Sequence, residues 1–322
     1  MTIQALSHRG SGPFTENALF YEYTKAADPI GSGAISPVPF AEFSSDLHTS
    51  GPTRVVPLDL SAKLEAPGPA TSPALCANFV RILAGESVET APNATSQLFY
   101  VIRGAGTTTF GADVIAWKAQ DFVALPAGSP AHHRATTESA FYLVHDEPLL
   151  RYLGARADVP RFKPTLYTSE ASLAALESVA AEGNAVNRSR VSVLLAGREQ
   201  DQTLTVTHTL WAMLGLLPIG AVQLPHRHQS VALDLILDCE PGCYTVVGTR
   251  LDERNRIVDP MRVDWKPYSA FVTPPGQWHA HFNESNKPAH LIPMQDAGLH
   301  TYLRTLDIQF VLPSKAAHAQ AR

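Results

Sequence analysis

The chain has 322 residues, with 25 Lys and Arg against 30 Asp and Glu, for a formal net charge of −5 at pH 7. The basic residues are scattered, which argues against a nucleic-acid partner, and three cysteines are too few for a disulfide framework and indicate a reducing compartment. No basic segment followed by an apolar one opens the chain and no apolar run is as long as a bilayer span, so we expect a cytoplasmic protein without a signal peptide or a membrane partner.

Residues 1–73 are predicted to form an N-terminal arm. They are rich in Pro, Gly and Ser, yet they carry too many aromatic side chains for a disordered tail. The aromatic positions are Phe14, Phe20, Tyr21, Tyr23, Phe40 and Phe43. We expect the arm to pack on the body of the protein or on a partner subunit, which favours a homo-oligomer, either a dimer or a tetramer. Pro67-Gly68-Pro69 and Pro73 mark its end.

Residues 74–165 are predicted to form an antiparallel β domain. Short apolar runs alternate with Gly and Pro turns, with no helical pattern between them, which is typical of a small sandwich or barrel. The predicted strands are residues 78–83, 97–103, 107–110, 122–125 and 141–144.

Residues 166–187 are predicted to contain a linker helix between two similar domains. Leu173, Leu176 and Val179 recur at helical spacing, Ser169 is a plausible N-cap, and Gly183-Asn184 is a plausible stop.

From residue 188 to 322 the β pattern returns, and this half is predicted to be a weak copy of the first. The predicted strands are residues 191–196, 203–217, 231–237, 244–247, 270–273 and 289–294. Val123-Ala-Leu-Pro126-Ala-Gly128 in the first half resembles Val272-Thr-Pro274-Pro-Gly276 in the second. The class is therefore all-β, with two barrels.

Two His-x-His pairs lie in the second half. His226 and His228 alternate, so on a strand both imidazoles would point to one face. His279 and His281 follow a tight Pro-Gly turn. We expect His226, His228 and His279 to converge as a facial set that leaves positions open on Fe(II), Mn or Cu. Structural histidines are the alternative.

The first half lacks these ligands. Counting from Gly85 and Gly220 places Ala91-Pro92-Asn93 where the second half has His226-x-His228. Its Pro-Gly turn is followed by His132 and His133, but His132 comes one residue later after Gly128 than His279 does after Gly276. We therefore expect the N-terminal domain to bind no metal.

These residues carry a family resemblance to the cupins. The matching motifs are Gly220-x5-His226-x-His228 and Pro274-x-Gly276-x2-His279-x3-Asn283. Two copies joined by a helix resemble a bicupin, which implies two double-stranded β-helix (jelly-roll) barrels. The acidic residue of many cupins is absent, since Ala232 and Leu233 stand at its positions. The resulting three-histidine site resembles gentisate and salicylate 1,2-dioxygenases, which are ring-cleaving enzymes.

The resemblance implies further site residues. Arg190 matches an arginine that faces the substrate carboxylate, Trp211 a tryptophan that packs on the ring, and His281 a histidine close to substrate and oxygen. Asp296 matches a second-sphere aspartate. For His281, catalytic acid–base work competes with a role as an orienting hydrogen-bond partner, and Trp211 is either a pocket or a core residue.

Two positions depart from the family. Gly215 stands where the family has Gln, and Asp234 stands where it has Arg. A carboxylate in place of a guanidinium reverses the local charge, so gentisate would lose a bidentate partner and gain a repulsion. Asp234 is a candidate for substrate binding if its side chain points into the barrel. The alternation of side chains along residues 231–237 also allows it to point outward.

The sequence predicts a non-haem Fe(II) dioxygenase that cleaves a hydroxylated aromatic ring, with a small aromatic molecule and dioxygen as its substrates. One alternative is another metal-dependent cupin enzyme, a decarboxylase or an isomerase with Mn, Zn or Ni. The other is a non-catalytic cupin that binds a small ligand.

Overall fold

The computed structural model describes residues 3–6, 12–182 and 191–311 of the chain. The chain divides into two compact units, Met1–Pro39 and Phe40–Arg322. The smaller unit contains the one-turn helix α1 (Tyr23–Ala26), which Glu22 caps by accepting a hydrogen bond from Thr24 N. Its aromatic side chains are open to solvent; Phe14, for example, is 96% exposed.

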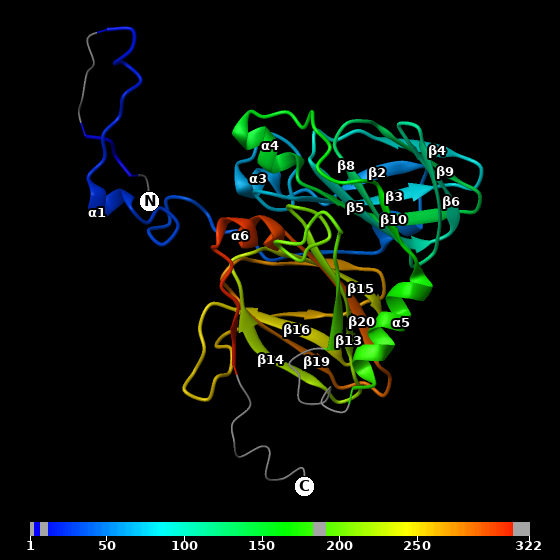
Figure 1. Ribbon diagram of the computed structural model, residues 1–322. Helices are drawn as coiled ribbons and strands as arrows, with labels where there is room; N and C mark the ends of the chain where they lie inside the picture. Colours follow the sequence, from blue (N-terminus) through cyan, green and yellow to red (C-terminus); the bar gives the residue numbers. More distant parts are fainter. Residues whose placement is uncertain (1–2, 7–11, 183–190, 312–322) are drawn as a thin grey trace. The chain divides into compact units, whose positions relative to one another are not determined.

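The first half of the larger unit is a barrel of two antiparallel sheets (Figure 1, cyan to green). The six-stranded sheet has the order β11-β8-β5-β10-β3-β2 and the four-stranded sheet the order β4-β9-β6-β7 in the described part of the chain. The strands are β2 (Arg54–Pro57), β3 (Cys76–Ile82), β4 (Ser87–Thr90), β5 (Ser96–Arg103), β6 (Ala105–Phe110), β7 (Asp113–Lys118), β8 (Phe122–Pro126), β9 (Ala131–Ala135), β10 (Ser139–His145) and β11 (Thr165–Tyr167).

The second half repeats this arrangement (Figure 1, yellow to orange). Over the described residues its sheets have the orders β1-β18-β15-β20-β13-β12 and β17-β16-β19-β14-β21. The strands are β1 (Ala41–Phe43), β12 (Val191–Leu195), β13 (Trp211–Leu217), β14 (Val222–Arg227), β15 (Ala232–Asp238), β16 (Cys243–Gly248), β17 (Met261–Asp264), β18 (Ala270–Thr273), β19 (Trp278–Asn283), β20 (Ala289–Gln295) and β21 (Gln309–Phe310).

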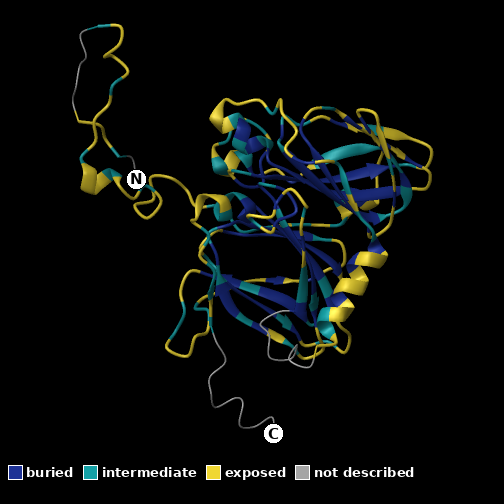
Figure 2. Cartoon of the chain, in the orientation of Figure 1, coloured by how far each residue is buried: buried dark blue, intermediate teal, exposed yellow. Residues whose placement is uncertain are grey.

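Each barrel is held by an apolar interior, and Figure 2 shows its strands as largely buried. Because side chains alternate along a strand, every second residue contributes to that interior. The first interior includes Phe99, Trp117, Val123, Phe141 and Leu143. The second includes Leu217, Ile236, Trp265, Phe271 and Leu291. Each barrel consists of two packed antiparallel sheets, so the all-β prediction is confirmed.

Part of the predicted arm is built into both barrels. Strand β1 pairs with β18 of the second barrel, and β2 pairs with β3 of the first. Between them lies the short helix α2 (Asp46–Thr49) with the fully buried His48. His48 Nε2 donates to the carbonyl of Tyr268 at 3.1 Å, and Nδ1 accepts from Arg103 Nη1 at 2.9 Å. Residues 40–57 thus connect the barrels.

Helix α5 (Ser169–Ala180) occupies the predicted linker and packs against β12 and β13. Its N-cap is Thr168, whose hydroxyl accepts from Ala171 N. The predicted cap, Ser169, is the first helical residue instead, and its N–H donates to Asp121 Oδ1 at 2.8 Å. The predicted stop at Gly183-Asn184 lies outside the described residues. The remaining helices are α3 (Ser61–Leu64), α4 (Glu147–Leu153) and α6 (Ala297–Leu303).

The strand predictions differ from the structure in two ways. The predicted run 203–217 is a strand only from Trp211, because Thr205 and Thr207 bond to nearby backbone carbonyls or amides in a turn. Short polar strands such as β4, β9 and β17 were not predicted, since they lack a long apolar run. Within the described ranges, no helix is long and apolar enough to cross a membrane.

Candidate metal centre

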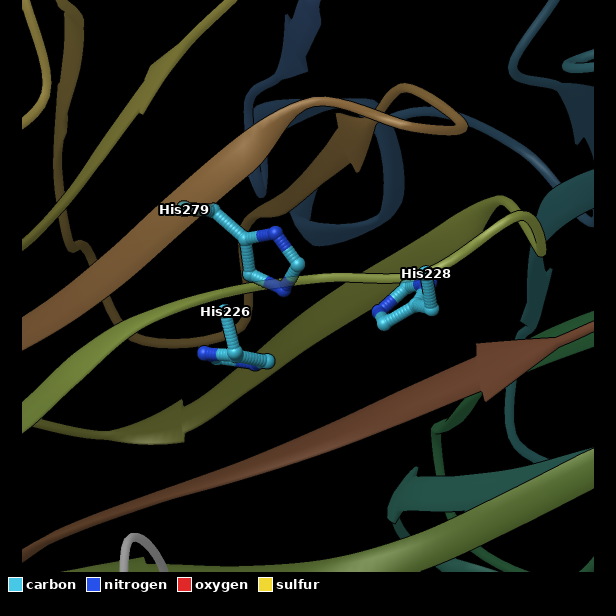
Figure 3. Close-up of side chains that lie close together, drawn as sticks. All are labelled: His226, His228 and His279. Atoms are coloured by element: carbon cyan, nitrogen blue, oxygen red, sulfur yellow. The ribbon is translucent and has the colours of Figure 1, made fainter. Parts of the chain in front are cut away.

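Three histidines converge inside the C-terminal barrel (Figure 3). His226 lies on β14, His228 follows directly after it, and His279 lies on β19. All three are buried, and one ring nitrogen from each lies within 4.8 Å of the others. In the described part of the chain no other group of His, Cys, Asp or Glu meets this criterion.

The local backbone explains the convergence. His226 pairs directly with His279 across β14 and β19. Gln223 pairs with His281, so β14 holds one extra residue between these pairs and forms a bulge, which re-aims side chains. Beyond the strand, His228 O accepts from Gly276 N at 2.7 Å. Gly276 has φ +72°, a conformation that suits glycine, so the predicted Pro-Gly turn holds the two ligand segments together.

The hydrogen bonds of the three rings fix their tautomers. In each ring Nδ1 faces a backbone carbonyl, which can only accept, so Nδ1 carries the hydrogen. The pairs are His226 with Leu224 O (3.2 Å), His228 with Ser230 O (2.8 Å) and His279 with Gln277 O (3.1 Å). In this tautomer Nε2 of each ring carries the lone pair that a metal ion requires, and Nε2 of His226 also lies 3.4 Å from Gln223 Nε2. The three residues therefore fit a transition-metal ion.

A cavity of about 220 Å³ borders the site. His226 and His228 form part of its wall, beside side chains that are mostly apolar. The other lining residues are Ser192, Leu194, Trp211, Met213, Gln223, Gln295, Ile308 and Phe310. Within the described part of the chain, the buried Ser192 Oγ and Trp211 Nε1 have no hydrogen-bond partner. Such a wall suits a flat apolar ligand with a few polar substituents.

The structure places Trp211 in the cavity wall, the position expected of a ring-packing residue. Arg190 lies outside the described residues. Gly215, which departs from the family, lies deeper on β13, where a Cβ would meet Ser192 Oγ at 3.2 Å and Leu291 Cδ2 at 3.3 Å. Sequence reasoning missed Met213, Gln223 and Phe310; the alternation of β13 and β14 was the available signal for the first two.

His281 is buried on the same strand as His279, two residues further on, so both rings face the interior. Its ring centroid lies 5.8 Å from that of His279 and 5.9 Å from that of His226. Nδ1 lies 2.7 Å from Thr245 Oγ1. It does not belong to the three-nitrogen cluster and stands beside it.

Asp296 does not line the cavity. It is buried between β20 and α6, and its Oδ1 accepts from Val231 N, directly before β15, at 2.9 Å. Burial raises the pKa of the Asp296 carboxyl to about 7. The described contacts are those of a residue that holds two chain segments together.

Asp234 points into the barrel. It lies two residues before the interior residue Ile236, with no register shift between them, and pairs with the interior residue Phe271. Its Oδ2 accepts from Thr273 Oγ1 at 2.9 Å. Asp234 is 2% exposed and is not among the cavity-lining residues.

Comparison with known proteins connects this geometry to a group of enzymes. No family model matches the chain. A stretch of 83 residues is 35% identical to gentisate 1,2-dioxygenase 1 of Aquipseudomonas alcaligenes; it covers 26% of this chain and only 20% of that protein.

Solved structures match over most of the chain. Salicylate 1,2-dioxygenase from Pseudaminobacter salicylatoxidans has a TM-score of 0.69 at 13% identity, covering 92% of this chain and 95% of that one. The same enzyme with gentisate has a TM-score of 0.63 at 13% identity, covering 87% and 81%. Oxalate decarboxylase of Bacillus subtilis, described with Mn(II) centres, has a TM-score of 0.56 at 11% identity, covering 88% and 82%. The chain has the bicupin fold and resembles the cupin ring-cleaving dioxygenases.

Proposed function

We propose that the protein is an Fe(II)-dependent dioxygenase that cleaves the ring of a hydroxylated aromatic compound. One observation carries the proposal: three buried histidines, each with Nδ1 bonded to a carbonyl, stand beside a mostly apolar cavity. His226, His228 and His279 would hold the iron through Nε2. Residues 74–165 form the N-terminal cupin without metal, 166–187 the linker, and 188–322 the metal-binding cupin.

The ligand set favours oxygen chemistry on an aromatic ring. Three neutral imidazoles add no negative charge, so bound Fe(II) would keep a net positive charge, attract an anionic oxygen of the substrate and allow dioxygen to bind beside it. The chain's own contribution is to position the ring. Trp211 and Phe310 offer flat apolar surfaces to that ring in the wall of the cavity. The family resemblance implies that Arg190 binds the carboxylate of the substrate.

The named relatives and one departure from their family support a proposal for the substrate class. The relatives are named for gentisate and salicylate. Here Asp234 adds an inward-facing carboxylate in the same barrel. We propose that gentisate itself is a poor substrate, and that a ring with an amino group, or without the second anionic substituent, is better.

The test is iron content combined with oxygen uptake on a panel of gentisate, salicylate, an aminophenol and hydroxyanthranilate. We expect one iron per chain and oxygen uptake with loss of the aromatic absorbance on at least one compound. Carbon dioxide release from oxalate-like acids without oxygen uptake would favour a decarboxylase instead. Tight binding of an aromatic acid without turnover, in iron-loaded protein, would favour a non-catalytic ligand-binding cupin.

We also propose that the chain forms a homo-oligomer. The exposed aromatic side chains of residues 12–39, such as Phe14 and Tyr23, support it, because large exposed apolar surfaces are typical of interaction sites. Sedimentation of the full chain and of a form lacking residues 1–39 tests the proposal. An unchanged monomer in both would contradict it.

A further inference from the structure

Two side chains behind His281 form a chain of hydrogen bonds to its ring. Trp265 Nε1 donates to Thr245 Oγ1 at 2.8 Å, and Thr245 Oγ1 lies 2.7 Å from His281 Nδ1. All three side chains are buried: Thr245 is 0%, His281 1% and Trp265 4% exposed. We call these three residues the C-terminal relay.

The relay determines which nitrogen of His281 carries the hydrogen. The indole N–H can only donate, so it uses one lone pair of the Thr245 hydroxyl. The hydroxyl hydrogen needs an acceptor because the group is fully buried, and His281 Nδ1 is the acceptor within reach. His281 is then the Nε2–H tautomer. The three metal-ligating candidates have the opposite tautomer, since their Nδ1 atoms donate to carbonyls.

The N-terminal barrel contains the same arrangement. Trp117 Nε1 donates to Thr108 Oγ1 at 2.9 Å, and Thr108 Oγ1 lies 2.8 Å from His133 Nδ1. Here the far side of the ring is also engaged, because His133 Nε2 lies 3.0 Å from Thr90 Oγ1. This N-terminal relay ends on a hydroxyl inside its own barrel.

Strand pairing shows what replaces that last hydroxyl in the second barrel. His133 pairs with Val88 as His281 pairs with Gln223. One pair further along, Thr90 pairs with Ala131, and His226 pairs with His279. The position of the terminal hydroxyl is therefore taken by a ligand histidine. The ring of His281 accordingly lies on the ligand side of the barrel, with its centroid 5.9 Å from that of His226 and 5.8 Å from that of His279.

We propose that Thr245 and Trp265 are positioning residues that hold His281 as an Nε2–H donor directed at a group bound to the three-histidine site. The inference rests on the proposed function, because the bound group would be an oxygen atom of the aromatic substrate or of dioxygen. The N-terminal relay uses the same three residue types only to fill and fix its barrel.

The first test is the tautomer of His281 in the metal-free protein, from long-range nitrogen–proton NMR correlations assigned with His281→Gln. We expect Nε2–H for His281 in the unaltered protein and Nδ1–H for His226, His228 and His279. An Nδ1–H tautomer for His281 overturns the proposal without any further variant. This reading requires neither iron nor turnover, so it stands apart from failure of the proposed function.

The second test removes the hydroxyl at matched positions of the two barrels. Thr245→Val keeps the shape and loses the donor, Thr245→Ser restores it, and Thr108→Val makes the same change in the N-terminal relay. We expect Thr245→Val to give mixed tautomers at His281 and to lower kcat about tenfold to a hundredfold with little change in KM, as for loss of one oriented donor. Thr245→Ser should recover both.

Thr108→Val should lower the melting temperature about as much as Thr245→Val and leave kcat and the His281 tautomer unchanged. Equal losses of kcat in both valine variants, or full activity in Thr245→Val, would overturn the proposal. If Thr245→Val does not fold, Trp265→Phe replaces it. Loss of the single Nε2–H tautomer in that variant supports the relay, and an unchanged tautomer with unchanged kcat overturns it.

Discussion

The two barrels of the larger unit have the same strand pairing but different side chains at equivalent positions. Where the second has the pair His226 and His279, the first has Thr90 and Ala131. The surrounding frame is retained: each barrel contains a Trp–Thr–His relay and a turn with a positive-φ glycine. A few substitutions on strand faces that already point inward are therefore enough to distinguish a candidate metal site from a scaffold.

A second difference lies in the layer beside the relay histidine. In the first barrel Phe99 packs edge-on against His133, at 5.3 Å between ring centroids. By strand pairing, the corresponding residue of the second barrel is Asp234, whose carboxylate accepts from Thr273. A buried carboxylate costs stability unless it is partnered, and the hydrogen bond from Thr273 offsets part of that cost.

The largest expected effect separates the barrels by metal content. His228→Ala should reduce bound iron from about one ion per chain to near zero, because two imidazoles alone hold iron weakly. His133→Ala removes an equally buried histidine of the other barrel and should leave the iron content unchanged, while destabilising the fold by about 2–4 kcal/mol through the cavity and the unpaired Thr108. Elemental analysis and urea unfolding provide the two measurements. Stoichiometric iron in His228→Ala would contradict the ligand assignment.

The next effect concerns pH. Burial raises the pKa of Asp296 to about 7 from its ordinary value of 3.8. The fold thus favours the protonated form, so this contribution to stability is fully present below pH 3.8 and is lost as the pH rises through 7. A shift of this size corresponds to about 4 kcal/mol.

Asp296→Asn should flatten the fall in unfolding free energy between pH 4 and pH 8, as measured by urea titration at each pH. The matched change in the first barrel is Asp146→Asn, at the residue that accepts from Thr95 N and Ser96 N. Burial raises the pKa of Asp146 as well, against hydrogen bonds that lower it, so a smaller change is expected there. An unaltered pH profile in Asp296→Asn would refute the raised pKa.

The smallest expected effect is on substrate preference. Two unit charges 4 Å apart at an effective dielectric of 20 interact by about 4 kcal/mol, and a larger separation reduces this. Asp234→Arg should therefore raise kcat/KM for gentisate relative to kcat/KM for an aminophenol. Asp238→Arg is the control, since Asp238 lies on the same strand with its side chain 63% exposed. An unchanged ranking in Asp234→Arg would show that the carboxylate does not sense the substrate.

Much of the fold and the outline of the site could be predicted from local patterns. Apolar strands such as β5 and β15 and helix α5 have periodic sequences, and the spacing of His226, His228 and His279 is itself the motif. Pairing was harder to predict. Counting from the glycines aligned Ala91 with His226, whereas the structure aligns Thr90, because β14 contains one extra residue. The alternation of apolar and polar residues in the sequence does not show where a strand contains an extra, unpaired residue.

The contacts between distant segments were also beyond the sequence. The role of residues 40–57 in connecting the barrels depends on His48 meeting Arg103 and Tyr268, which lie far away in the chain. The relays were missed for the same reason: Thr245 and Trp265 are ordinary strand residues until the fold places them behind His281.

The most direct test of the central claim is anomalous diffraction at the iron edge from crystals of the iron-loaded protein. The account predicts one peak per chain, bonded to Nε2 of His226, His228 and His279, and none in the N-terminal barrel. A peak at His133 or in the cavity of about 490 Å³ around Pro92 and Gly128 would contradict it, as would a metal bound through Nδ1 of the three histidines.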